Sequence, residues 1–294
     1  MRTPPSWRRR ERVVGLAAVV PALILVLGLM LYPIGYALFV SVFDTNGISF
    51  DFVGLDNYIT QVFSPLLHQV FFNNLVFLIS VPLVILASVV CSVLLYERIR
   101  GWRAYRILFF VPNVLSTAVV GLMFKTMFAY DGPVNAGLTA IGMPRTDFFA
   151  GAGSAMSVII LALVWSGFGY QTLILLSGLG AINPEIFEAA TVDGAGWWRR
   201  LWHITLPNIR RSVALVCILN VLFTFTSLFG FIFVMTAGGP GYDTTTLDYL
   251  IYLEAFPSDG NIGPGSALAI LTFLFIGILT IIQLRFFRVG SAED

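Results

Sequence analysis

The chain has 294 residues, of which 57% are hydrophobic and 11% are charged. A water-soluble domain of this length carries about 25% charged residues, so this composition indicates a chain that buries its apolar surface in lipid. The formal net charge of +1 gives no indication of nucleic-acid binding. The cysteines, Cys91 and Cys217, lie inside apolar segments, which argues against a disulfide framework or a metal site.

The first apolar segment is uncharged from Val13 to Phe43 and follows a cluster of arginines. It is far longer than the roughly 7–15 residues of a secretory signal core, so we predict a retained membrane helix. Pro21 and Pro33 are expected to allow kinks in this helix. Residues 1–12 are predicted to form a basic cytoplasmic N-terminus.

Further apolar segments follow that are long enough to cross the hydrocarbon core as helices, for which about 20 residues suffice. They extend over about residues 70–96, 107–128, 156–179, 212–235 and 266–284. Helices are expected because lipid cannot satisfy exposed backbone polar groups. We therefore predict an all-α membrane protein with six transmembrane helices, a transmembrane domain over residues 13–288 and a cytoplasmic tail over residues 289–294.

The distribution of positive charge predicts the orientation. All but two of the 17 Lys and Arg residues lie in the N-terminus, between the second and third apolar segments, between the fourth and fifth, or near the C-terminus. The exceptions are Lys125 and Arg145. Because Lys and Arg accumulate in cytoplasmic loops, we predict that both termini and the segment before the fifth helix face the cytoplasm.

That segment, residues 183–207, is polar enough to lie in water. Asn183 is suited to cap a helix and Pro184 to occupy its first position. Gly194 and Gly196 are expected to end this helix, because glycine adopts backbone conformations that other residues avoid.

A second short helix is expected from Trp197 to His203, after which Pro207 opens the fifth apolar segment. The segment from residue 183 to residue 207 carries a set of residues at fixed spacing: Glu188, Ala189, Ala190, Asp193, Gly194, Ile204, Leu206 and Pro207. This spacing resembles the E-A-A…D-G-A…I-x-L-P loop of permease subunits in binding-protein-dependent importers driven by an ATP-binding cassette (ABC). In that family the loop is a coupling helix that docks on the ATPase, and the resemblance implies the type I ABC importer permease fold. The alternative is an ordinary amphipathic connecting helix.

Two further stretches resemble the same permeases. Phe52 to Tyr58, F-V-G-L-D-N-Y, resembles their sugar branch, and a G-G-P turn followed by T-x-x-L-x-x-x-I-Y-x-x-A-F is typical of permeases for sugars and glycerol-phosphate compounds. Gly-Gly-Pro-Gly at 238–241 predicts a tight turn. The segment behind it is too short and polar to span and is expected at the outer surface.

No ATP-hydrolysing or other catalytic site is expected in this chain. A P-loop needs Gly-Lys followed by Ser or Thr, whereas the only lysine, Lys125, follows Phe124. Ion-coupled carriers place acidic or His side chains inside the bilayer, and the predicted spans carry none outside their boundary regions, so a secondary carrier or channel is disfavoured. The resemblance implies that no cofactor binds here and that ATP and magnesium bind to a partner ATPase.

Polar and aromatic residues inside the spans are candidates for a translocation path. They are Asn113, Trp165, Gly167, Tyr170, Gln171, Asn220 and Thr224. Sugars are bound by amide and hydroxyl groups combined with aromatic stacking. The glycines between Trp165 and Gln171 are expected to allow a close approach. In the resembled family the segments on both sides of the coupling loop supply sugar contacts, and Gly167, Tyr170, Asn220 and Thr224 match these segments by their spacing from Glu188. The alternative is helix packing, where small and polar residues also concentrate.

The resemblance implies a permease subunit that forms half of the pathway for a sugar or oligosaccharide in a bacterial cell membrane. The expected partners are a second homologous permease, two copies of an ABC ATPase and an extracytoplasmic binding protein that largely selects the substrate. An importer for glycerol-phosphate compounds is the alternative within the family.

Overall fold

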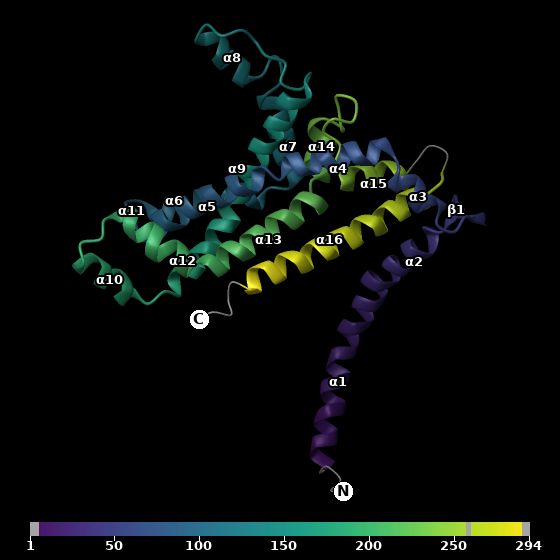
Figure 1. Cartoon of the computed structure of the whole chain (residues 1–294), viewed down its shortest axis with the longest axis horizontal. Helices are drawn as coiled ribbons and strands as arrows, with labels where there is room; N and C mark the ends of the chain where they lie inside the picture. Colours follow the sequence, from purple (N-terminus) through teal and green to yellow (C-terminus); the bar gives the residue numbers. More distant parts are fainter. Residues whose placement is uncertain (1–5, 257–259, 290–294) are drawn as a thin grey trace. The chain divides into compact units, whose positions relative to one another are not determined.

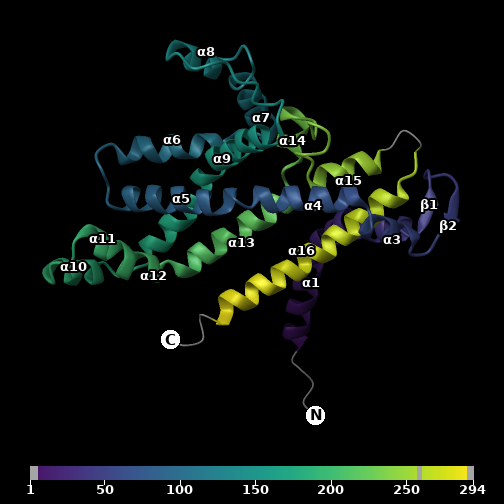
Figure 2. The same cartoon turned by 45° about the horizontal axis from the view of Figure 1, so that its top comes forward.

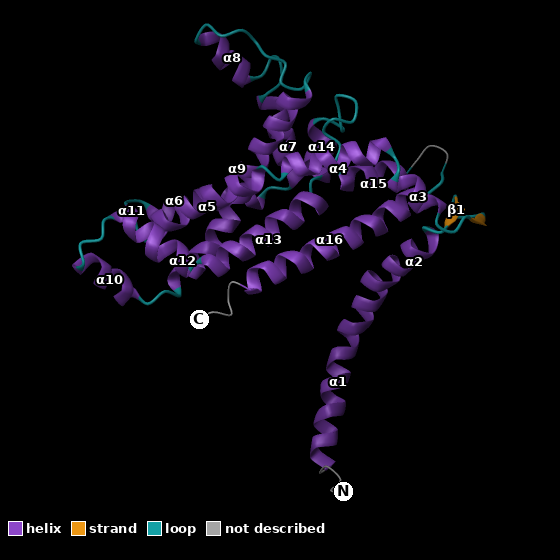
Figure 3. Ribbon diagram, viewed as in Figure 1, coloured by secondary structure: helices purple, strands orange, loops and turns teal. Residues whose placement is uncertain are grey.

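The computed structural model describes residues 6–256 and 260–289, and this part is helical apart from one small two-stranded sheet (Figure 3). Residues 1–5 of the predicted N-terminal segment and residues 290–294 of the predicted tail lie outside the described residues. The chain divides into two compact units, residues 1–63 with 251–272 and residues 64–250 with 273–294. Figure 1 labels the elements along the chain.

The first unit opens with one long irregular helix. It consists of α1 (Ser6–Val26), the π-helix η1 (Leu27–Leu31) and α2 (Tyr32–Val40), followed by β1 (Phe43–Thr45), β2 (Phe50–Phe52) and α3 (Asp56–Val62). The amide of Tyr32 bonds to the Leu27 carbonyl, five residues back. This wide turn lies directly before Pro33, which cannot donate a backbone hydrogen bond, so the irregularity lies at the second predicted proline position.

The stretch from Phe52 to Tyr58 folds the loop of the first unit. Asn57 Nδ2 donates to the carbonyl oxygens of Ser41 and Phe43, at 3.0 Å each. The hydroxyl groups of Tyr58 and Ser41 are 2.6 Å apart. These bonds tie α3 to the end of α2 and to β1, so this sugar-permease-like stretch has a structural role here.

The second unit contains most of the helices. They are α4 (Pro65–Phe77), α5 (Ser80–Tyr96), α6 (Trp102–Val114), α7 (Thr117–Met127), α8 (Pro133–Ala140), α9 (Ala152–Gly180), α10 (Pro184–Val192), α11 (Trp197–Arg200), the π-helix η2 (Leu201–Thr205), α12 (Leu206–Asn208), α13 (Arg210–Thr226) and α14 (Phe229–Met235). The helices α15 (Leu247–Ala255) and α16 (Gly263–Val289) contribute to both units. Helix α9 packs along α5, with α6 and α13 beside them (Figure 2).

Four helices of the described part are long and apolar enough to cross a membrane: Ala17–Val40, Pro65–Tyr96, Ala152–Gly180 and Gly263–Phe287. They correspond to the first, second, fourth and sixth predicted spans. Two further pairs pass the same test only together, because each is bent at a short break. The described part thus has four spans, or up to six if each bent pair is one span.

The predicted third span, about residues 107–128, consists of two helices rather than one. Helices α6 and α7 are bent by 98° at Leu115 and Ser116. Pro112 interrupts the backbone ladder of α6, and the Ser116 side chain accepts a hydrogen bond from the amide of Val119. The chain therefore ends one helix and caps the next inside an apolar stretch.

The predicted fifth span is also divided. Helix α13 ends at Thr226 and α14 begins at Phe229, where the amide donates to Oδ2 of Asp248 at 2.6 Å. Asp248 thus caps a helix that is distant in sequence. Burial raises the pKa of its carboxyl group, while hydrogen bonds from Thr246 and from backbone amides oppose the rise.

The start of the fifth span also differs from the prediction. Pro207 lies in α12 rather than at the start of α13, and the short helix that begins at Trp197 extends to Asn208 instead of ending at His203. Ile209 lies between them with a non-helical backbone, and the axis turns by 69° there. This turn separates the surface segment from the apolar helix.

Two buried clusters hold the second unit together. One joins α7, α9 and α14 around Ile159, Phe231 and Ile232. The other joins α5, α9 and α13 around Leu175 and Val216. Burying such side chains contributes roughly 1.5–3 kcal/mol each relative to an aqueous reference.

The close approach of α6 and α9 depends on Gly169. A Cβ atom at Gly169 of α9 would overlap the carbonyl oxygen of Phe109 in α6. We expect Gly169→Ala to lower the free energy of unfolding by about 1–3 kcal/mol, because neither backbone can move without repacking. The measurement is thermal unfolding of the purified chain in detergent.

Gly180→Ala is the matched control, because Gly180 belongs to the same helix and nothing lies within 4 Å of its added Cβ. Equal effects of the two substitutions would contradict this account of the α6–α9 contact.

Candidate functional site

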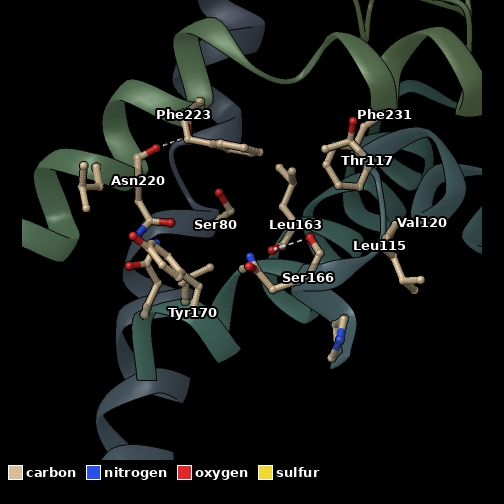
Figure 4. Close-up of a pocket in the computed structure, with 17 residues that line it drawn as sticks. Ser80, Leu115, Thr117, Val120, Leu163, Ser166, Tyr170, Asn220, Phe223 and Phe231 are labelled. Atoms are coloured by element: carbon tan, nitrogen blue, oxygen red, sulfur yellow. Dashed lines mark hydrogen bonds between the residues drawn. The ribbon is translucent and has the colours of Figure 1, made fainter. Parts of the chain in front are cut away.

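A cavity of about 400 Å³ lies among the helices of the second unit (Figure 4). Its lining residues come from α5, α6, α7, α9, α13 and α14 and from the break between α6 and α7. They are Ser80, Val84, Pro112, Asn113, Leu115, Thr117, Val120, Leu163, Ser166, Gly167, Tyr170, Gln171, Leu219, Asn220, Phe223, Thr224 and Phe231. In Figure 4, Asn220 and Tyr170 lie on one side of the cavity, and Leu115, Val120 and Phe231 on the other.

The cavity brings together every predicted path residue except Trp165. Asn113, Gly167, Tyr170, Gln171, Asn220 and Thr224 all line it. Trp165 instead packs into the cluster around Ile159, with its ring 5.8 Å from that of Phe124. Neighbouring positions on a helix point about 100° apart, so a cavity on one side of α9 excludes some of them.

The lining combines polar and apolar side chains and is uncharged. No Lys, Arg, His, Asp or Glu is among the lining residues, all of which lie in the described part of the chain. Oε1 of Gln171 is buried without a hydrogen-bond partner. Because a buried carbonyl oxygen normally has a partner, this atom is available to a donor that enters the cavity. Tyr170 is 46% exposed and adds an accessible phenol ring.

The two glycines of the path stretch have different roles. The nearest atom to a Cβ at Gly167 is a methyl carbon of Val84 at 3.7 Å, an ordinary contact distance. Gly167 therefore leaves space in the cavity, whereas Gly169 allows two helices to touch. Of these two glycines, only Gly169 lies where another backbone approaches closely.

Two adjacent asparagines of α4 tie this helix to the cavity wall and to the loop before α15. Asn74 of α4 is fully buried; its Nδ2 donates to the Thr224 carbonyl at 2.8 Å, and its Oδ1 accepts from the Leu247 amide at 2.9 Å. Asn73 donates to the carbonyl oxygens of Tyr242 and Thr245, at 2.9 Å each. The sequence contains a signal for this role, because two adjacent asparagines inside an apolar helix need hydrogen-bond partners when they are buried.

A second site is the surface segment from Asn183 to Pro207, here called the coupling segment. Oδ1 of Asn183 accepts from the Glu185 amide at 3.1 Å, as expected of a helix cap. At the other end of α10, Gly194 has φ +73° and Ala195 donates to the Ala190 carbonyl at 2.9 Å. This is the Schellman arrangement, in which a left-handed glycine closes the helix.

The fixed-spacing residues of the coupling segment divide into two groups. Glu188, Ala189, Asp193, Gly194 and Pro207 are exposed, whereas Ala190 is buried and Ile204 and Leu206 are half-buried. The exposed group offers a surface to a partner, and the others pack the segment onto the rest of the unit.

Aromatic packing links α10 to the membrane helices. The ring of Phe187 lies 5.6 Å from that of Tyr96 at the end of α5. Phe187 and Trp197 both pack against the cluster around Leu175. Arg200 donates to the hydroxyl of Thr191 at 3.1 Å, which ties the two halves of the segment together. A displacement of α10 would therefore disturb the packing of α5, α9 and α13.

Comparison with known proteins identifies the class. A family model described as "Binding-protein-dependent transport system inner membrane component" matches residues 59–288. The chain is 33% identical over 270 residues to the multiple sugar-binding transport system permease protein MsmF of Streptococcus mutans, covering 91% of this chain and 92% of that protein. It is 32% identical over 274 residues to the sn-glycerol-3-phosphate transport system permease protein UgpA of Yersinia pestis, covering 91% and 92%.

A third relative is the sulfoquinovosyl glycerol transport system permease protein SmoG of Agrobacterium fabrum, 31% identical over 293 residues, covering 97% of this chain and 94% of that protein. Among solved structures, a chain of a bacterial alginate ABC transporter in complex with an alginate pentasaccharide-bound periplasmic protein superposes with a TM-score of 0.86. That match covers 98% of both chains at 20% identity.

The structure and these matches define a multi-pass helical membrane protein with the type I ABC importer permease fold, as predicted. The chain belongs to the family of binding-protein-dependent transport system inner membrane components.

The Asn74 bridge gives a prediction for the cavity wall. We expect Asn74→Leu to lower the free energy of unfolding by at least about 1–3 kcal/mol, because the Thr224 carbonyl and the Leu247 amide both lose a buried partner. Thermal unfolding of the purified chain measures the effect.

Gln69→Ala is the control, since Gln69 also bonds to the loop before α15, at Asp243, but in an exposed position. A loss of stability in Gln69→Ala as large as in Asn74→Leu would contradict the importance assigned to burial.

Proposed function

We propose that this chain forms half of the translocation pathway of an ATP-driven importer for an uncharged sugar or oligosaccharide. The observation that carries the proposal is the cavity, where Asn220, Tyr170 and Gln171 combine amide and phenol groups with apolar walls. Its volume of about 400 Å³ suits part of a sugar chain, within the roughly 300–1,000 Å³ usual for ligand sites.

The absence of charge among the lining residues distinguishes between the two cargo classes of the relatives. UgpA is named for sn-glycerol-3-phosphate and MsmF for multiple sugars. A phosphate needs a cation or an array of donors to offset the loss of its hydration, and this lining supplies no cation. Sugar hydroxyls need only neutral donors and acceptors, which Gln171 and Asn220 carry.

The coupling segment connects the pathway to the ATPase that supplies its energy. In this proposal an ABC ATPase binds the exposed residues of α10 and its C-terminal cap, with Glu188 and Asp193 among them, and ATP and magnesium bind to that ATPase rather than to this chain. Closure of two ATPase copies moves α10, and the aromatic contacts of Phe187 pass the movement to α5 and α9. The cargo is released because the two states of the helices contact it differently.

The remaining partners complete the assembly. A second homologous permease supplies the other half of the pathway, and an extracytoplasmic binding protein delivers the cargo. Both termini and the coupling segment lie in the cytoplasm, as supported by the concentration of arginine on that side. The chain itself carries out no catalysis.

Uptake of labelled compounds by a strain lacking the gene tests the cargo assignment. We expect the restored chain to support uptake of a neutral sugar and not of glycerol phosphates. Within that assay, Asn220→Ala and Tyr170→Phe should impair uptake per assembled complex about fivefold to a hundredfold, because each removes a hydrogen bond of about 1–3 kcal/mol.

Trp165→Phe is the matched control for these variants, because Trp165 lies on the same helix as Tyr170 but does not line the cavity. Unchanged uptake per complex in both cavity variants would remove these residues from the site. Uptake of glycerol phosphate alone would overturn the neutral-cargo assignment.

The left-handed glycine that ends α10 provides a prediction for coupling to the ATPase. Gly194→Ala forces a left-handed conformation on alanine at a cost of about 1–2 kcal/mol, so we expect weaker ATPase co-purification and slower uptake. Glu188→Lys should abolish both while the chain still inserts, because it reverses an exposed charge of the docking surface.

Gly196→Ala is the control for this pair. Gly196 lies two residues away with φ −65°, and nothing lies within 4 Å of its added Cβ. If Gly194→Ala and Glu188→Lys retain normal uptake, the coupling segment does not have the role proposed for it.

A further inference from the structure

The second half of the coupling segment meets α13 at a steep angle. Residues 197–208 form one helix whose axis is bent by 69° from that of α13. Transmembrane helices tilt by about 20° on average from the membrane normal. If α13 crosses the membrane near that angle, the helix before it lies closer to the membrane plane than to the normal.

This helix has two distinct faces. Trp197, Leu201 and Leu206 pack against the buried cluster around Leu175. On another face Trp198 is 68% exposed and Trp202 is 62% exposed. These two tryptophans are four residues apart, which places them on the same side of a helix. Trp198 also packs edge-to-face on Trp197, with ring centroids 4.6 Å apart, yet Trp198 and Trp202 both remain largely exposed.

The charged residues of this helix and of the first turn of α13 have one sign. Residues 197–211 contain Arg199, Arg200, Arg210 and Arg211 and no Asp or Glu. Helix α10, by contrast, carries Glu185 and Glu188 and no Lys or Arg. The two halves of the coupling segment therefore suit different surroundings.

We propose that the exposed face of residues 197–208 lies in the headgroup layer of the membrane, with Trp198 and Trp202 inserted and the neighbouring arginines bound to anionic phospholipids. Tryptophan concentrates at membrane interfaces because its ring is apolar and its N–H is polar. Each Lys or Arg beside an anionic leaflet adds to the attraction. The acidic α10 is repelled by the same surface and stays in water for its protein partner.

This contact gives the coupling segment a fixed support. Helix α10 can be displaced by a partner while the helix behind it stays at the level of the headgroups. The displacement then bends the chain at Gly194–Gly196 and at Ile209. The proposal concerns the membrane contact alone and does not depend on the nature of the cargo.

Depth-dependent quenching in nanodiscs tests the proposal. The full-length chain, purified with the subunits that accompany it, is freed of Cys91 and Cys217 and given one cysteine, by Trp202→Cys or by Val192→Cys. Each is labelled with an environment-sensitive fluorophore. Val192 on α10 is the matched control, since it is 87% exposed in the same segment. The quenchers are a lipid spin-labelled near the headgroup and aqueous iodide.

We expect the spin-labelled lipid to quench the label at position 202 at least about twofold more than the label at 192, with iodide showing the reverse order. Adding phosphatidylglycerol to about a third of the lipid should strengthen the lipid quenching at 202, and Arg199→Gln with Arg211→Gln should remove that gain.

Equal lipid quenching at the two positions would overturn the proposal. Protection of position 202 from both quenchers would also overturn it, because a protein subunit rather than lipid would then cover this face. Quenching at 202 that ignores phosphatidylglycerol would overturn the part of the proposal that concerns anionic lipid.

Discussion

Backbone groups inside a membrane must find partners within the protein, and this constraint explains how the second unit can break its helices. Ser116 caps α7 after the break that follows α6. Asp248 caps α14 after the break that follows α13. The cavity lies among these interrupted helices, since Leu115, Thr117, Phe223 and Phe231 all line it. Polar side chains thus make it possible to have irregular backbone, and with it a space, inside an apolar bundle.

The sequence predicted the spans better than their interruptions. Hydropathy located the unbroken helices, such as Ala152–Gly180, because length and apolar character are local properties. The bend after α6 has a local signal in Pro112 and Ser116, which hydropathy does not detect. The division after Thr226 had none, because the group that stabilises it, Asp248, is distant along the chain. Contacts that form only in the folded chain cannot be inferred from hydropathy.

The candidate sites show the same distinction. The ends of α10 were predictable, because a cap at Asn183 and a closing glycine at Gly194 act on their own neighbours. The path residues were chosen by chemical type, and all but Trp165 line the cavity. Trp165 lies outside the lining, and composition could not indicate this because it does not say which side of a helix faces the cavity. The spacing of the coupling segment likewise did not separate its exposed Glu188 from its buried Ala190.

The adjacent amides of Asn73 and Asn74 have a consequence for communication across the protein. Asn73 holds the loop before α15 at Tyr242 and Thr245, and the next residue holds the Thr224 carbonyl in the cavity wall. One turn of α4 therefore connects this loop to the cavity through two neighbouring amides. A displacement of the loop would reach the cavity wall through these hydrogen bonds.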